Sequence, residues 1–150
     1  MPVRVRLSEI VGGMDLSSDR VTAHLHRPTG RVVMITDDAA RAAELGDDAW
    51  VMPEELADAR AVAAHADEYV ALPNRAAIDE HHMMEQFAFA LDDALVRESV
   101  CDALRGVGAF GRFKAMVHRL GLAEAWHTHR SSAYTEIARN WCEANGVDVD

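Results

Sequence analysis

The hydrophobic pattern changes its period partway along the chain, and this change constrains the fold more than any other feature. Over residues 21–26 apolar and polar side chains alternate, which is typical of a half-buried β-strand. From Met84 onward apolar side chains recur every three or four positions, which is typical of amphipathic helices. A strand region followed by a run of helices predicts the α+β class.

Residues 20–36 are predicted to form an antiparallel hairpin. Its turn places Pro28 second and Gly30 fourth, as a type I turn prefers, and a β-branched apolar run over residues 31–36 supplies the second strand. Residues 68–72 offer a possible third strand. We therefore expect a small antiparallel β-sheet packed against a C-terminal helical half.

Helices are expected before and after this hairpin. Residues 3–13 are predicted to form a short helix that Gly12 and Gly13 end. Residues 37–67 predict one or two surface helices broken near Pro53, because proline disfavours helix at the residue before it. The apolar faces of the helical half are predicted to be Met84, Phe87, Ala88 and Leu91; Val96, Val100, Ala103 and Leu104; Phe110, Phe113, Val117 and Leu120; and Tyr134, Ile137, Ala138 and Trp141, before Asn145-Gly146 ends the last helix.

The length of 150 residues is usual for one domain and allows a core that folds without disulfides or a structural metal. We expect a single domain, residues 1–150, with a mixed part over 1–76 and a helical part over 77–150. Cys101 and Cys142 match no zinc or disulfide spacing. The N-terminus lacks the apolar core of a signal peptide, and no apolar run is long enough for a membrane span. These features predict a cytoplasmic protein without a membrane-spanning segment.

Charge is distributed unevenly along the chain. The formal net charge is −10, which disfavours a general nucleic-acid binder. The segment 103–130, in contrast, holds a single carboxylate, that of Glu124, among five cationic side chains. These cations are Arg105, Arg112, Lys114, Arg119 and Arg130. A basic segment on an acidic body can concentrate an anionic ligand locally.

Two glycines precede a predicted helix within this segment, where the first N–H groups of the helix have no intrahelical partner and can bind an anion. The glycines would allow close backbone approach, the cations would supply charge, and a partly exposed tryptophan could stack on the ligand. The predicted ligand-binding residues are Gly106, Gly108, Arg112, Lys114, Trp126 and Arg130. The alternative is a solvated helix face and a simple turn. The segment is not a P-loop, because neither Ser nor Thr follows Lys114.

A histidine cluster is the best candidate for a metal. His81 and Glu85 lie one helical turn apart and could reach one ion beside His82, but the H-E-x-x-H motif is absent. A zinc site needs three or four ligands, so His24 and His26 would have to be brought in by the fold. No G-x-S-x-G elbow occurs, and Ser131-Ser132 is predicted to be a turn or helix N-cap rather than a nucleophile.

A set of sequence motifs covers nearly the whole chain. Their positions are Met84 and Phe87; Gly106, Gly108, Ala109, Phe110, Phe113 and Lys114; Trp126; and Ile137, Ala138, Trp141, Cys142, Glu143, Asn145 and Gly146. Together with the opening hairpin, these motifs resemble the bacterial uncharacterised protein family 0158. Gly111 stands where the family often has the first of two arginines, which lowers the charge of the basic segment. The resemblance implies a class and no mechanism.

These observations favour a non-catalytic cytosolic binding or regulatory module over an enzyme, and they name no cofactor and no oligomeric state. The expected partner is an anionic small molecule or an acidic protein surface. Two alternatives stay open. One is a metal-dependent hydrolase that uses the histidine cluster, and the other is an interaction protein whose acidic residues 37–68 dock on a basic partner.

Overall fold

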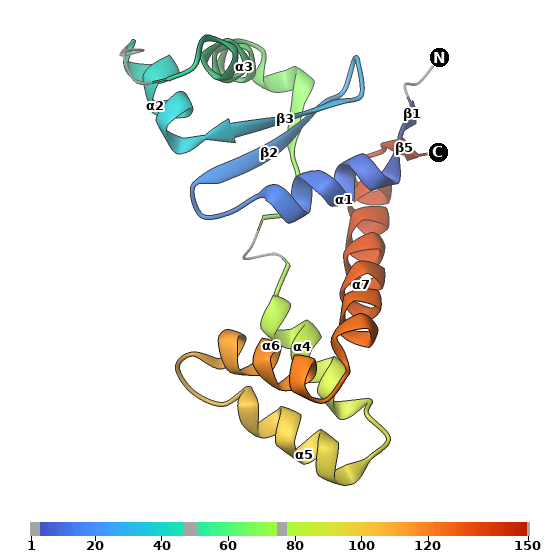
Figure 1. The fold of residues 1–150 in the computed structure, drawn as a ribbon. Coiled ribbons are helices and arrows are strands. Elements are labelled where there is room, and N and C mark those ends of the chain that lie inside the picture. Colours follow the sequence, from blue (N-terminus) through green and yellow to red (C-terminus); the bar gives the residue numbers. More distant parts are fainter. Residues whose placement is uncertain (1–3, 47–50, 75–77, 150) are drawn as a thin grey trace. The chain divides into compact units, whose positions relative to one another are not determined.

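The computed structural model describes residues 4–46, 51–74 and 78–149 (Figure 1). The chain separates into two compact units: unit 1 comprises residues 1–78 and 135–150, and unit 2 comprises residues 79–134. Its elements in order are β1 (Arg4–Val5), α1 (Leu7–Leu16), β2 (Val21–His26), β3 (Arg31–Thr36), α2 (Asp37–Leu45), α3 (Pro53–Ala64), η1 (a 3-10 turn, Ala66–Glu68), β4 (Tyr69–Ala71), α4 (Glu80–Phe89), α5 (Ala94–Ala103), α6 (Ala109–Arg119), α7 (Ala123–Ala144) and β5 (Asp148–Val149). The predicted α+β class is confirmed.

Unit 1 contains a three-stranded antiparallel sheet in the order β3-β2-β4. Both the predicted hairpin and the third strand are confirmed. Residues directly opposite each other share a face, so Ala23 and Val32 point to one side of the sheet while Val33 and Ile35 point to the other. Val33 and Ile35 pack with Ala39 of α2 and with α3. The expected packing of the sheet against the C-terminal helical half stays a prediction.

The prediction for the first helix is wrong at both ends. The chain begins its described part with β1, and α1 continues through Gly12 and Gly13 to Leu16. Ser17 ends the helix, because its hydroxyl donates to the carbonyl of Met14 at 2.6 Å. Gly13 serves close packing instead, since a Cβ there would lie 2.8 Å from the Leu72 side chain.

The break predicted near Pro53 is confirmed, and each flanking helix has a local start signal. The Thr36 hydroxyl accepts a hydrogen bond from the N–H of Ala39 at the start of α2. Pro53 occupies the first turn of α3, where its missing N–H costs nothing. Neither helix lies wholly on the surface, because α2 buries Ala42 and α3 buries Leu56.

The C-terminal residues belong to unit 1, although the sequence assigns them to the helical part. Trp141 donates its indole N–H to the carbonyl of Ala71 at 3.1 Å, and β5 pairs in parallel with β1. Helix α7 ends as predicted, because Gly146 takes a φ of 66° and Val147 donates back to the helix. Whether the two units behave as one domain stays a prediction.

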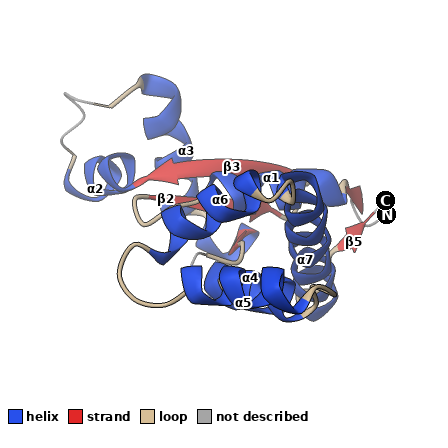
Figure 2. Ribbon diagram, turned by 60° about the horizontal axis from the view of Figure 1, so that its bottom comes forward, coloured by secondary structure: helices blue, strands red, loops and turns tan. Residues whose placement is uncertain are grey.

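Unit 2 is built from α4, α5, α6 and the first part of α7 (Figure 2). Its core holds an aromatic cluster, in which the Trp126 ring lies 4.9 Å from Phe113 and 5.5 Å from Phe87, centroid to centroid. The predicted apolar face of α6 is only half buried, because Phe110 and Leu120 are 43% and 38% exposed. Among the described helices, none is both long and apolar enough to cross a membrane.

Candidate anion-binding face of helix α6

A glycine determines where helix α6 begins, and two buried residues in its middle determine which side faces the core. Gly108 caps its start in the left-handed conformation, with a φ of 79°. Phe113 and Val117 are four positions apart and buried, which fixes the side that faces the core. The helix ends at Arg119, and Gly121 two residues later takes a φ of 71°.

The opposite side of α6 is basic, and we call it the α6 face. Its centre is small, because a Cβ on Gly111 would meet no atom within 4 Å and Ala115 lies one turn further on. No carboxylate occurs within this helix. The α6 face consists of Gly111, Arg112, Lys114, Ala115, His118 and Arg119, all of them exposed.

Arg112 braces the loop before α6. Its guanidinium donates to the carbonyl oxygens of Arg105 and Val107. Gly108 leaves room for it, because a Cβ there would lie 3.2 Å from Arg112 Nη1, whereas a Cβ on Gly106 would lie at an ordinary contact distance of 4.0 Å from Nη2. Gly108 thus gives space to a side chain of the same chain, and the close approach of an anion to the two glycines stays a prediction.

Lys114 remains on the surface at the middle of the α6 face. Its Nζ lies 4.4 Å from the centroid of the Phe110 ring, an arrangement in which the ring attracts the ammonium group. Arg105, outside the helix, pairs with Asp102 at 3.5 Å, and its side chain is 81% exposed. Such an exposed ion pair contributes about 0–1 kcal/mol to the stability of the fold, and it leaves the Arg105 side chain accessible to solvent.

Arg130 is held away from this face by a partly buried ion pair. Its Nη2 lies 2.8 Å from Glu80 Oε1 and donates to the Tyr134 hydroxyl at 2.9 Å, while its guanidinium carbon lies 4.2 Å from the centre of that ring. The Tyr134 hydroxyl also donates to the Glu80 carboxylate. Removing one partner of a largely buried ion pair leaves the other without compensation, and the Glu80 side chain is only 12% exposed, so Arg130 is a structural residue here.

The expectation that Trp126 is a partly exposed stacking platform is wrong. Its side chain is 3% exposed, and it packs edge-on against two phenylalanines of unit 2. The prediction of a turn or helix N-cap at Ser131-Ser132 is also wrong, because those serines lie inside α7. With the helix begun at Ala123, Trp126 falls eight positions before buried Tyr134 on one inward stripe, a signal present in the sequence.

The histidine cluster does not assemble a metal site in the described part of the chain. His81 Nδ1 lies 2.7 Å from Glu85 Oε1, and its Nε2 lies 3.2 Å from the carbonyl of Leu104, so both ring nitrogens already face acceptors. No group of three or more His, Cys, Asp or Glu side chains among the described residues could hold an ion. The hydrolase alternative therefore has no structural observation in its support.

The two strand histidines share one sheet face, as predicted, and each has a partner in its own unit. His24 Nε2 lies 3.0 Å from the Thr22 hydroxyl, and burial lowers the pKa of this imidazole below 6.5. His26 contacts the Thr29 hydroxyl at 2.7 Å and the Glu68 carboxylate at 3.4 Å. These contacts fix the rings within the sheet rather than around an ion.

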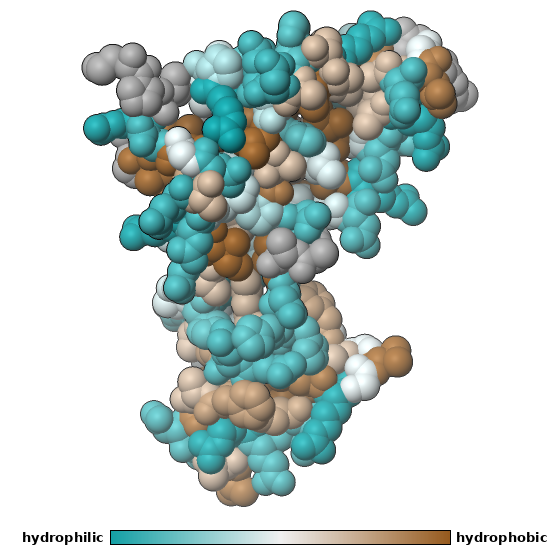
Figure 3. All heavy atoms as spheres, turned by 180° about the vertical axis from the view of Figure 1, so that it is seen from behind, coloured by the Kyte–Doolittle hydropathy of each residue, from teal (hydrophilic) through white to brown (hydrophobic). Residues whose placement is uncertain are grey.

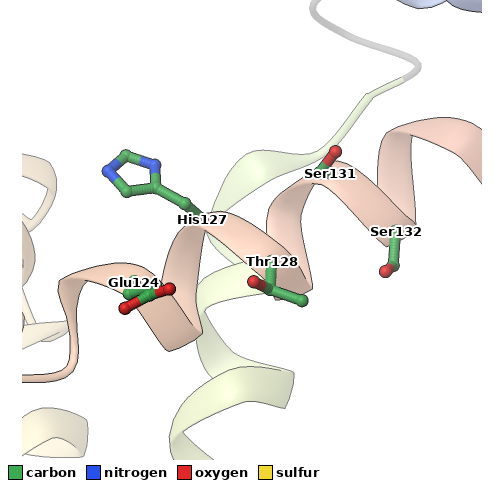
Figure 4. A pocket seen from close by; sticks show the side chains of 5 residues that line it. All are labelled: Glu124, His127, Thr128, Ser131 and Ser132. Carbon is green, nitrogen blue, oxygen red and sulfur yellow. The ribbon is translucent and has the colours of Figure 1, made fainter.

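The remaining candidate reactive side chains, along α7 and at Cys142, do not come together to form a catalytic site. A shallow hollow of about 560 Å³ lies along the first half of α7, lined by Glu124, His127, Thr128, Ser131 and Ser132. All five project outward from one helix (Figure 4), so no second element faces them within this lining. Burial raises the pKa of the Cys142 thiol, which disfavours the reactive thiolate.

His129 has one feature that sequence patterns did not indicate. Its Nε2 is buried and has no hydrogen-bond partner among the described residues. The ring lies 5.6 Å from Phe87 and 6.0 Å from Trp126, so the imidazole fills space in the aromatic cluster.

The α6 face is thus the one predicted region in which the structure gathers exposed cations on a single element of unit 2. Lys114, Arg112 and Arg119 share it, although the Arg112 guanidinium also donates to the preceding loop. Arg130 is held in an ion pair and Trp126 is buried. Comparison with known proteins adds nothing to this geometry: no family model, no curated protein and no solved structure matches the chain.

Proposed function

We propose that this protein is a non-catalytic cytosolic binding module, and that its α6 face binds an anionic partner. The observation that carries this proposal is the composition of α6, whose eleven residues include two arginines, a lysine and a histidine, all exposed, and no carboxylate. The whole chain has a formal net charge of −10, so the net charge of this helix is opposite in sign to that of the protein as a whole. Membership of family 0158 is part of the proposal and adds no activity to it.

Charge spacing along α6 supports a ligand rather than a merely solvated surface. Side chains three or four positions apart are neighbours on a helix, and opposite charges there stabilise it by about 0.2–0.5 kcal/mol. Lys114 and His118 have this spacing, and Arg119 follows directly, without a carboxylate between them. The helix forgoes a stabilisation that an acidic neighbour would provide, and an anionic partner would supply the missing charge.

Shape supports the same proposal. Gly111 and Ala115 leave the middle of the α6 face low, with the cations on either side of it. A partner chain can therefore approach the helix backbone closely and meet cations along both edges. Close approach increases electrostatic attraction, because the energy of two charges rises as their separation and the amount of intervening water fall.

Binding of a fluorescent polyglutamate peptide, measured by anisotropy, tests this proposal. We expect Lys114→Glu with Arg119→Glu to weaken binding about tenfold, since each exposed pair is worth about 1 kcal/mol or less and 1.4 kcal/mol is tenfold in affinity. Binding of the wild type should also fall at high salt, because mobile ions screen exposed charges.

The control variant is Arg60→Glu with Arg139→Glu, which changes the net charge equally at exposed positions of α3 and α7. It should bind the peptide nearly as well as the wild type. Equal weakening in both variants would mean that only net charge matters, and a wild type that does not bind would reject the proposal. Thermal unfolding of each variant shows that the fold is retained.

The alternative, an interaction through the acidic residues 37–68, has less structural support. Helices α2 and α3 turn Ala39, Ala42 and Leu56 inward, which leaves most of their carboxylates at the surface. Arg31 nevertheless pairs with Asp58 at 3.6 Å, so part of this acidic surface is neutralised within unit 1. An interaction through residues 37–68 stays a prediction.

A further inference from the structure

The loop between α5 and α6 presents an apolar side chain that contributes nothing to the core. Val107 at its tip is 98% exposed, and Gly106 and Gly108 beside it have φ values of 78° and 79°. In Figure 3 an apolar tip projects from unit 2 at the place of this loop. Hydrophobic stabilisation scales with the area removed from water, so the fold gains nothing from Val107.

This loop is tied to the helix that follows it. The Arg112 guanidinium, from the first turn of α6, donates to the carbonyl oxygens of Arg105 and Val107. These two hydrogen bonds tether the backbone of the loop to α6. A loop that is tethered before binding loses less conformational freedom on binding, which favours its apolar side chain as a contact residue.

Val107 lies in the loop two residues before α6 begins, and a row of exposed side chains follows it on the helix. This row consists of Phe110, Lys114 and His118, which follow one another at intervals of four and so lie on the same side of the helix. Phe110 is 43% exposed, and Lys114 lies over its ring. The row is therefore apolar at its N-terminal end and cationic along the rest.

We propose that the partner of the α6 face is a protein segment with a large apolar side chain at one end of a run of carboxylates. The apolar side chain packs on Val107 and Phe110, and the carboxylates pair with Lys114, His118 and Arg119. This inference rests on the proposed function and names the class of its partner.

The chemistry of this row favours a protein segment over a nucleic acid. A phosphate backbone brings a charge with every nucleotide and offers no aliphatic side chain for Val107. A chain with a net charge of −10 also repels a polyanion at long range, whereas a short acidic segment meets the basic α6 face locally. An acidic segment with an apolar end matches both halves of the row.

The test uses pairs of fluorescent peptides with identical carboxylates and the intact protein. One peptide of each pair has leucine at one end and the other has serine there, with the N-terminal and the C-terminal placement both tried. We expect the wild type to bind a leucine peptide about tenfold more tightly than its serine partner, because an aliphatic group is removed from water. Val107→Ser should remove this preference, so that the two peptides of a pair bind this variant with similar affinity.

Leu95→Ser is the matched control, because Leu95 is also an exposed apolar side chain, at 77%, and lies on α5 of the same unit. It should keep the preference for leucine. If the wild type binds both peptides equally while Lys114→Glu with Arg119→Glu weakens both, the inference fails and the proposed function stands. If neither peptide binds, both fail.

Two further outcomes would overturn the inference by naming another occupant. A single-stranded oligonucleotide that binds more tightly than either leucine peptide would assign the α6 face to nucleic acid. A dimer seen by sedimentation, dependent on protein concentration and lost in Val107→Ser, would assign the apolar end to a second copy of the chain.

Discussion

Two adjacent glycines of α1 have different roles, although the sequence suggested that together they end the helix. A Cβ on Gly12 would meet no atom within 4 Å. A Cβ on Gly13 would lie 2.8 Å from Leu72 Cδ2 and 3.0 Å from Val32 Cγ1. Leu72 is only 6% exposed, so its side chain cannot move aside into solvent. Gly13 therefore lets the helix lie against the sheet, whereas Gly12 only adds flexibility to the unfolded chain.

We predict that Gly13→Ala lowers the free energy of unfolding by about 1–2 kcal/mol, because extra volume in a packed core forces strain. Gly12→Ala should raise it by about 0.5–1 kcal/mol, because alanine is the better helix former and no neighbour is displaced. Urea denaturation of the two variants measures both values. Stabilisation of similar size by both substitutions would show that α1 and the sheet are not in close contact.

At the scale of an element, strand β2 carries a titratable group into a partly buried position. His24 pairs in register with Val33 on one side and Ala71 on the other, in the middle of the sheet. Burial disfavours the charged imidazole and lowers its pKa from 6.5. The folded protein therefore binds this proton less readily than the unfolded chain does.

We predict from this that stability falls as pH drops below about 6.5 towards the lowered pKa, because the unfolded state then gains protons first. Well above 6.5 the imidazole is neutral in both states and contributes no pH dependence. His24→Gln should reduce the loss of stability between about pH 7 and about pH 5, measured by urea denaturation. His127→Gln, at an exposed position of α7, is the matched control and should leave more of that loss in place.

At the scale of the whole molecule, unit 2 is one continuous segment and unit 1 is made of two. The chain enters unit 2 at Asp79 and leaves it at Tyr134, and these ends are joined by Glu80, Arg130 and Tyr134. The aromatic cluster lies wholly inside the segment. Unit 2 therefore holds both its core and the contacts that close its ends.

We predict that the excised segment 79–134 is helical and unfolds cooperatively, although so small a core gives a narrow margin of stability. Its fluorescence should report a buried indole, because Trp126 is 3% exposed and no other tryptophan lies in the segment. Glu80→Gln should lower its melting temperature by weakening the closure of its ends. Residues 1–78 alone should not fold, since they lack Trp141 and β5. A segment 79–134 without cooperative unfolding would contradict the division into two units.

Short stretches of the sequence by themselves determined the hairpin, the helix break before Pro53 and the end of α7 at Gly146. These features depend on backbone conformations and on alternation over a few residues, so local patterns predict them. The basic composition of α6 was likewise visible, because it belongs to one helix.

The tertiary structure alone decided which candidate side chains are accessible to a ligand and which glycine is packed against a neighbour. Arg130 pairs with Glu80, fifty positions away, and Trp126 is enclosed by side chains from α4 and α6. Gly13 is constrained by Leu72, which follows it in the chain after three strands and two α-helices. Contacts between residues so far apart in the chain depend on how elements pack, and a local pattern carries no information about a partner that only folding brings near.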